Sequence, residues 1–113
     1  MIIIRENITL GDLKAMAEAM FGDMVKAVVD IERGIIAVDA ELHSDLEALL
    51  IKDGSKPGVL WGVNLYPEKR ASDFIEYDSL INIRPSVGNR SRGVENDEIR
   101  RKIADLAGKI VGQ

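Results

Sequence analysis

The fold is decided by the stretch VKAVVDI-ERG-IIAVDAEL, residues 25–42. Two runs rich in β-branched residues, 25–31 and 35–42, flank the short loop Glu32-Arg33-Gly34. Valine and isoleucine favour strands. A glycine in the last loop position accepts the positive φ that a short hairpin loop with a bulge requires. The stretch therefore predicts a β-hairpin whose two strands are these two runs.

Toward the N-terminus, the run Ile2-Ile3-Ile4 ends in charged residues and predicts a short buried strand. Thr9 is followed three positions later by Asp12, a pair that predicts the N-terminal cap of a helix. Apolar residues then recur at helical spacing, and Gly22 predicts the end of this helix.

Beyond the hairpin, Ser44 and Glu47 form a capping-box pair, which predicts a short helix that ends near Lys52. Residues 53–58 contain several helix and strand breakers and predict a loop. The alternation of residues 59–66 then predicts a strand.

Residues 74–84 alternate again and predict a further strand, which Pro85 ends because proline cannot continue a strand ladder. Asn96 predicts the cap of a final helix. The stripe of this helix that we expect to be buried consists of Ile99, Ile103, Leu106 and Ile110.

These elements follow the order β-α-β-β-α-β-β-α and predict an α+β fold, a mostly antiparallel sheet packed by helices in two layers. The chain has 113 residues, of which 46% are hydrophobic and 30% are charged. This length and composition suffice for one core without metal or disulfide cross-links. We therefore expect residues 1–113 to form a single globular domain.

The charge of the chain is unevenly distributed, although its formal net value is only −4. Residues 1–53 carry −6, residues 54–83 carry −1 and residues 84–113 carry +3. An acidic first half lacks the broad basic surface that duplex nucleic acid requires. The five aromatic residues are scattered and offer no stacking platform for single strands. The sequence therefore does not favour a nucleic-acid partner.

The chain contains no cysteine, which excludes disulfides, thiolate zinc sites and cysteine nucleophiles. No apolar stretch approaches the ~20 residues needed to cross a bilayer. Charge at Arg5 and Glu6 comes too early for the apolar region of a signal peptide. We therefore expect a cytoplasmic protein with no membrane partner.

The most unusual segment is RPSVGNRSRG, residues 84–93, which lies between a predicted strand and a predicted helix. Arginine guanidinium groups bind carboxylate or phosphate in bidentate fashion, and glycines let backbone N–H groups converge on an anion. The segment lacks the glycine-lysine-serine/threonine signature of a P-loop. The predicted ligand-binding residues are Arg84, Ser86, Asn89, Arg90, Ser91 and Arg92. The alternative is that the three arginines pair with the acidic first half and hold the loop in place.

A second group is Asp39, Glu41 and His43, which point the same way if the strand stays extended as far as His43. These residues are competent for acid–base catalysis, with His43 titrating near neutral pH. With Asp30 or Asp45 they are also competent ligands for Mn²⁺, Fe²⁺ or Zn²⁺. The third alternative is that the carboxylates face solvent and His43 merely precedes a helix cap. The sequence does not identify a cofactor, and we predict no specific metal site.

A third group is a polar sheet face, formed if the strands 59–66 and 74–84 pair. Asn64 and Tyr66 on this face are further predicted ligand-binding residues. Simple exposure explains a polar face equally well. A serine nucleophile at Ser86 or Ser91 has no support, because the glycine-x-serine-x-glycine elbow is absent.

Several segments resemble a small prokaryotic family known as a domain of unknown function of about this length. These segments are Val28–Ile31, Val38–His43, Leu60–Pro67, Ile81–Ser86 and Gly88–Arg92. The resemblance covers the full chain and is most specific in the last segments. It implies a self-contained protein and supplies no activity, fold or ligand. Val87 stands where the motif of that family has glutamine.

Two functions follow from these patterns. The first is a small-molecule site, in which the 84–92 loop binds a carboxylate or phosphate and His43 supplies acid–base chemistry. The second is a non-enzymatic interaction module, such as a homodimer in which the acidic half of one copy meets the basic end of another. The sequence does not decide whether the protein is an enzyme. Catalysis is favoured if His43 and the 84–92 loop lie within reach of each other around one cleft.

Overall fold

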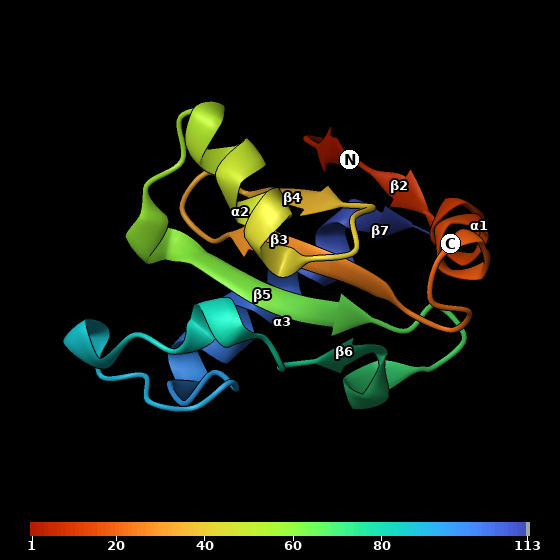
Figure 1. Ribbon diagram of the computed structural model, residues 1–113. Coiled ribbons are helices and arrows are strands. Elements are labelled where there is room, and N and C mark those ends of the chain that lie inside the picture. Colours follow the sequence, from red (N-terminus) through yellow and green to blue (C-terminus); the bar gives the residue numbers. More distant parts are fainter. Residues whose placement is uncertain (113) are drawn as a thin grey trace.

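The predicted hairpin forms the centre of a five-stranded sheet in the computed structural model, which describes residues 1–112 (Figure 1). All neighbouring strands of this sheet are antiparallel. In spatial order the strands are β1 (Ile2–Ile4), β4 (Ile35–Val38), β3 (Val25–Asp30), β5 (Leu60–Leu65) and β6 (Ile75–Glu76). The predicted α+β class with a mostly antiparallel sheet is therefore confirmed.

The hairpin turn is closed by the carboxylate of Asp30, which is fully buried. Its Oδ1 accepts hydrogen bonds from the backbone N–H groups of Glu32 (2.9 Å) and Arg33 (2.8 Å), and its Oδ2 accepts one from Ser55 Oγ (2.6 Å). Gly34 has a φ of 70°, as expected for the last residue of this loop. Asp30 thus serves the turn and is not available as a metal ligand.

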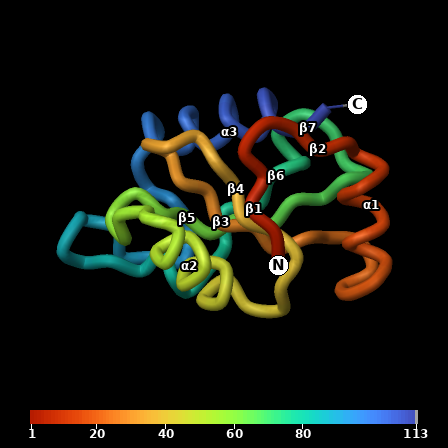
Figure 2. Tube along the Cα trace, turned by 90° about the horizontal axis from the view of Figure 1, so that it is seen from above, coloured from red at the N-terminus to blue at the C-terminus, as the bar shows by residue number. Residues whose placement is uncertain are grey.

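Helices cover both faces of the sheet, so the fold has three layers instead of the predicted two (Figure 2). The helices are α1 (Leu10–Ala19), α2 (His43–Lys52) and α3 (Asp97–Ile110). Side chains of α1 and α3 pack on one face, and Leu46 and Leu50 of α2 pack on the other. The reason lies in the hairpin strands β3 and β4, which place apolar residues on both faces of the sheet, as is usual for strands covered on both sides.

Two caps predicted from the sequence are confirmed. Thr9 and Asp12 form a reciprocal capping box at the start of α1, and the side chain of Asn96 accepts from the N–H of Ile99 at the start of α3. The predicted cap at Ser44 is wrong. The N-cap lies two residues earlier, at Leu42, whose side chain makes no capping hydrogen bond, and α2 begins at His43.

A second, two-stranded sheet was not predicted. It pairs β2 (Ile8–Thr9) with β7 (Val111–Gly112) in parallel. Strands of two residues carry no alternation that a sequence pattern can reveal. This sheet ties the C-terminal end of α3 to the start of α1.

The predicted strand 74–84 is wrong beyond Glu76, because only β6 (Ile75–Glu76) pairs with β5. The chain then forms two short 3₁₀ turns, η3 (Leu80–Asn82) and η4 (Pro85–Val87). Side chains take the place of the missing strand along the outer edge of β5. The amide of Asn82 accepts from Gly62 N (2.8 Å) and donates to Gly62 O (2.9 Å). The guanidinium of Arg84 donates to the carbonyl oxygen of Leu60.

Gly62 is required where this edge is completed. A Cβ added at Gly62 would lie 2.6 Å from both the Cβ and the Oγ of Ser79, which is itself buried. The close approach brings the 79–82 segment near enough for Asn82 to reach the backbone of β5.

Among residues 1–112, no helix combines the length and the apolar character that a bilayer span demands.

We predict that Gly62→Ala lowers the free energy of unfolding by ~1–3 kcal/mol, the usual cost of overpacking a filled core. Gly58→Ala is the matched control, because a Cβ at Gly58 meets no heavy atom within 4 Å. Urea denaturation of both variants measures the difference. Equal stability losses in the two variants would contradict the close approach at Gly62.

Candidate functional site

His43 is the first residue of α2 and is 8% exposed. Its Nε2 lies 2.8 Å from the backbone carbonyl oxygen of Val63 on β5. A carbonyl only accepts hydrogen bonds, so Nε2 carries the proton and Nδ1 keeps its lone pair. Burial lowers the pKa of His43 below its ordinary value, although the hydrogen bond to Val63 acts in the opposite direction. His43 is therefore a neutral imidazole at pH 7.

Asp39 and Glu41 do not share a face with His43. Strand β4 ends at Val38, and Asp39 has a φ of 74°, so the chain leaves the extended conformation before His43 is reached. Glu41 is exposed, whereas His43 is buried. The predicted strand over 35–42 is wrong in its second half, because β4 ends at Val38. Asp39, Glu41 and His43 therefore do not point the same way. No group of three or more His, Asp or Glu residues within 1–112 is arranged to hold a metal ion.

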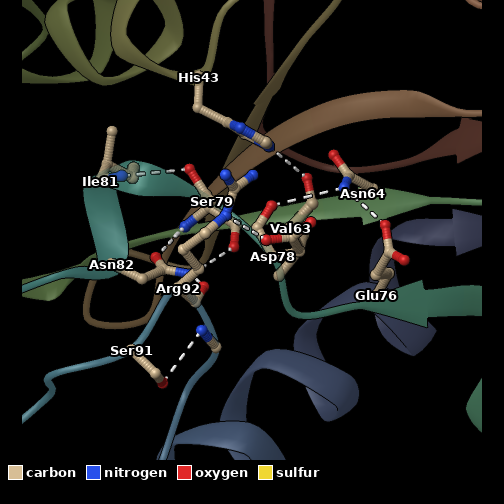
Figure 3. A network of polar contacts seen from close by, with 12 residues as sticks. His43, Val63, Asn64, Glu76, Asp78, Ser79, Ile81, Asn82, Ser91 and Arg92 are labelled. Atoms are coloured by element: carbon tan, nitrogen blue, oxygen red, sulfur yellow. Dashed lines mark hydrogen bonds and ion pairs between the residues drawn. The ribbon is translucent and has the colours of Figure 1, made fainter.

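The surroundings of His43 are instead polar side chains from β5 and from the segments that follow it (Figure 3). Asn64 Nδ2 donates to Glu76 Oε1 (2.8 Å), and Arg92 Nε donates to Asp78 Oδ1 (2.6 Å). The charges of Asp78 and Arg92 both influence the pKa of His43. We call this group, completed by Tyr66, the polar cluster; its members are His43, Asn64, Tyr66, Glu76, Asp78 and Arg92. The structure thus brings His43 together with one arginine of the 84–92 loop.

Two members of the polar cluster share the carboxylate of Glu76. Tyr66 donates its hydroxyl to Glu76 Oε1 (3.0 Å), the same oxygen that accepts from Asn64. Burial, followed by this hydrogen bond, raises the pKa of Tyr66. The Oδ1 atom of Asn64 is buried and has no hydrogen-bond partner among the described residues. The cluster therefore contains one unused acceptor beside the neutral imidazole.

The 84–92 loop is held in place by two buried asparagines. Asn89 Nδ2 lies within hydrogen-bond distance of the carbonyl oxygens of Asn82 (2.7 Å), Gly93 (2.8 Å) and Ser91 (3.1 Å). Asn89 Oδ1 accepts from Glu95 N (2.8 Å). Asn82, besides its pairing with Gly62, donates to the carbonyl oxygen of Arg92 (2.9 Å). The backbone of this loop is consequently fixed from inside the protein.

Arg84 points inward and completes the edge of β5. Besides its bond to Leu60, its guanidinium lies 5.0 Å from the centroid of the Trp61 ring and 3.6 Å from Glu47 Oε2. Burial lowers the pKa of Arg84, and the nearby Glu47 partly opposes this effect. These contacts match the structural alternative that the sequence left open for this arginine.

The backbone amides of the loop already hold an anion of the protein itself. The N–H groups of Arg90 and Ser91 both donate to Glu95 Oε2, at 2.8 Å and 2.9 Å. These bonds lower the pKa of Glu95. Ser91 Oγ accepts from Gly93 N (3.2 Å), and Ser86 is exposed on η4. The sequence analysis missed Glu95, although an acid three residues after an arginine-rich loop was a visible signal.

The side chains of Arg90 and Arg92 remain at the surface of the loop. Arg90 makes no ion pair with any residue from 1 to 112, and the side chain of Arg92 is 55% exposed. Of the three predicted anion-binding arginines, the structure thus leaves two facing solvent and one turned into the fold.

The comparison with known families agrees with the resemblance carried by these segments. Residues 2–110 match the family described as "Protein of unknown function (DUF5674)". The chain belongs to this family. No curated protein and no solved structure matches the chain. The family description names no activity, so any function of this DUF5674 chain must be argued from its geometry.

We predict that the single histidine of this DUF5674 chain titrates below its ordinary range, because burial of the ring lowers its pKa more than the hydrogen bond to Val63 raises it. The chain has one histidine, so its NMR signals need no further assignment. The ¹⁵N shifts at pH 7 should show Nε2 protonated and Nδ1 unprotonated. A midpoint at or above ~6.5, the value of a free histidine, would contradict the buried neutral ring.

The same shift has a consequence for stability. Because the unfolded chain binds a proton at His43 more readily than the folded one, the free energy of unfolding should rise as pH rises through the window between the two pKa values. His43→Gln keeps an N–H donor for Val63 and cannot titrate. The rise below about pH 6.5 should therefore be smaller in His43→Gln than in the wild type, as measured by urea denaturation. Parallel pH profiles would contradict it.

Proposed function

We propose that the protein binds a small acidic ligand through the side chains of Arg90 and Arg92, the second of which belongs to the polar cluster. The observation that carries this proposal is a rigid loop with two exposed guanidinium groups. Asn82 and Asn89 fix its backbone through buried hydrogen bonds. Binding to a loop that is already ordered avoids the entropic cost of ordering it.

The proposal assigns recognition to side chains and not to backbone amides. The N–H groups of Arg90 and Ser91 are occupied by Glu95, so they are not free for a ligand. The ion pair between Arg92 and Asp78 is partly exposed on both sides. Such pairs contribute only about 0–1 kcal/mol, so a ligand carboxylate or phosphate can compete for the guanidinium. The hydroxyls of Ser86 and Ser91 are the neutral donors nearest in sequence.

The polar cluster indicates which further chemical group the acidic ligand carries. Asn64 offers an unused acceptor oxygen, and the neutral His43 offers the lone pair of Nδ1. Both atoms favour a hydroxyl or amino hydrogen on the ligand. A small hydroxy acid or amino acid supplies such a group together with a carboxylate. Acid–base chemistry belongs to the same proposal, with Nδ1 of His43 as the atom that accepts a proton.

Titration with inorganic phosphate, succinate and malate, followed by ¹⁵N–¹H NMR, tests the loop site. We expect shifts at residues 89–95 and tighter binding of malate, which carries a hydroxyl, than of succinate. Arg90→Gln and Arg92→Gln should each weaken binding roughly tenfold, a loss of about 1.4 kcal/mol. Arg101→Gln is the matched control, because Arg101 is exposed and lies on α3 instead of the loop. Equal effects of all three variants, or no shifts in the loop, would contradict the proposal.

Self-association is a second candidate function, and exposed apolar side chains next to the loop favour it. Leu80, Ile83 and Val87 are 67%, 42% and 56% exposed. In this proposal, the basic end of one copy meets the acidic half of a second copy around these side chains. Sedimentation at low and high salt should then show a dimer that Val87→Ser weakens. A monomer at micromolar concentration in both salts would remove this candidate.

A further inference from the structure

A cavity of about 740 Å³ lies on the other side of the sheet from α2. Its walls come from the start of α1, the C-terminal half of α3 and the connection between β5 and β6. In Figure 2 this connection, residues 66–74 in green, runs beside α1 and the C-terminal end of α3. The volume falls within the range of small-molecule sites, about 300–1,000 Å³.

The inner walls of the cavity are apolar. Leu10, Phe74 and Val111 line it from three different elements. On α3 the lining residues are Ala104, Ala107 and Gly108, whose spacing of three and four residues places them on one helix face. A Cβ added at Gly108 would meet no heavy atom within 4 Å. Small side chains on this face therefore leave room that the rest of the fold does not fill.

The cavity also has a cationic rim, formed by Lys14, Lys69 and Arg70. The only acidic residue among its lining residues is Glu68, which lies 3.9 Å from Lys14 Nζ. Lys69 Nζ lies 4.4 Å from the centroid of the Tyr66 ring, and Arg70 makes no ion pair with a residue from 1 to 112. A cavity lined by two excess positive charges, in a chain of net charge −4, is complementary to an anion.

The backbone next to this rim adopts a left-handed conformation. Ala71, which lines the cavity, has a φ of 53°. Residues with a Cβ rarely adopt this region, and such outliers concentrate at ligand sites. Arg70, the residue before Ala71, lines the same cavity.

We propose that this cavity binds an amphipathic carboxylate, whose acidic group contacts Lys14, Lys69 and Arg70 while its aliphatic body lies against α3. Neither feature alone selects this class: an apolar wall accepts neutral molecules, and a cationic rim accepts inorganic anions. The site is separate from the loop of the proposed function, because the two share no residue.

Calorimetric titration with decanoate, well below its micelle-forming concentration, tests the proposal against two partial ligands. Decanol carries the chain without the charge, and acetate carries the charge without the chain. We expect one decanoate per protein, bound at least tenfold more tightly than either partial ligand. Decanol that binds as well as decanoate, or binding that does not saturate at one molecule per chain, would overturn the proposal.

Variants then locate the site. Arg70→Gln and Lys69→Gln should each weaken decanoate binding several-fold, whereas Arg90→Gln should not change it. Ala104→Trp fills the cavity from an exposed position of α3 and should abolish binding. Ala48→Trp, at an exposed position of α2, is the matched control. Circular dichroism and melting temperature verify that both tryptophan variants fold.

The outcomes keep the two sites distinct. Loss of decanoate binding in Arg90→Gln, or its persistence in Ala104→Trp, would overturn the cavity proposal and leave the loop proposal intact. Loss of malate binding in Arg90→Gln with unchanged decanoate binding would support both.

Discussion

The side-chain amide of Asn82, paired with the backbone of Gly62, is the contact on which the second half of the molecule depends. On its outer edge, strand β5 pairs with β6 only at Asn64 and Leu65, because β6 ends at Glu76. Farther along, the amide of Asn82 donates to and accepts from Gly62 as a neighbouring strand would. A side-chain amide carries the same donor and acceptor as a peptide group, so it satisfies backbone atoms that would otherwise be buried without partners.

That single contact positions the features on which the functional argument rests. Asn82 also binds the carbonyl oxygen of Arg92, and the carbonyl oxygen of Asn82 accepts from Asn89. The loop is therefore fixed to the edge of the sheet, near the polar cluster around His43. Arg84 extends the same edge by bonding to Leu60. The residues of the arginine-rich segment thus divide into a buried set that builds the loop and an exposed set that can meet a ligand.

The sequence predicted the elements whose signals are local. The hairpin at 25–38 combined β-branched runs with a glycine turn, and the caps at Thr9 and Asn96 require only residues three positions away. The prediction failed where a distant partner decided the conformation. The alternation of residues 74–84 has the period of a strand, yet no sequence pattern reveals that the Asn82 side chain replaces the strand's backbone. The prediction that a strand reaches Leu42 was wrong for a different reason. Asp39 has a positive φ, which no pattern in the sequence indicates.

For the candidate site, the structure shows which of the predicted residues make internal contacts and which face solvent. Arg84 and Asn89, both predicted to bind a ligand, make internal hydrogen bonds. Guanidinium and amide groups can bind a ligand or make internal hydrogen bonds, so residue type alone does not distinguish the two roles. The cavity between α1 and α3 had no signal, because its cations and its small residues come from segments far apart in the chain.

Hydrogen exchange at the Gly62 amide tests the central contact most directly. This N–H points away from β3 and is bonded to a side chain alone. We predict that it exchanges as slowly as the neighbouring amide of Val63 in the wild type. In Asn82→Ala it should lose this protection while the amides of β3 keep theirs. A Gly62 amide that exchanges freely in the wild type, or is equally protected in Asn82→Ala, would contradict the account.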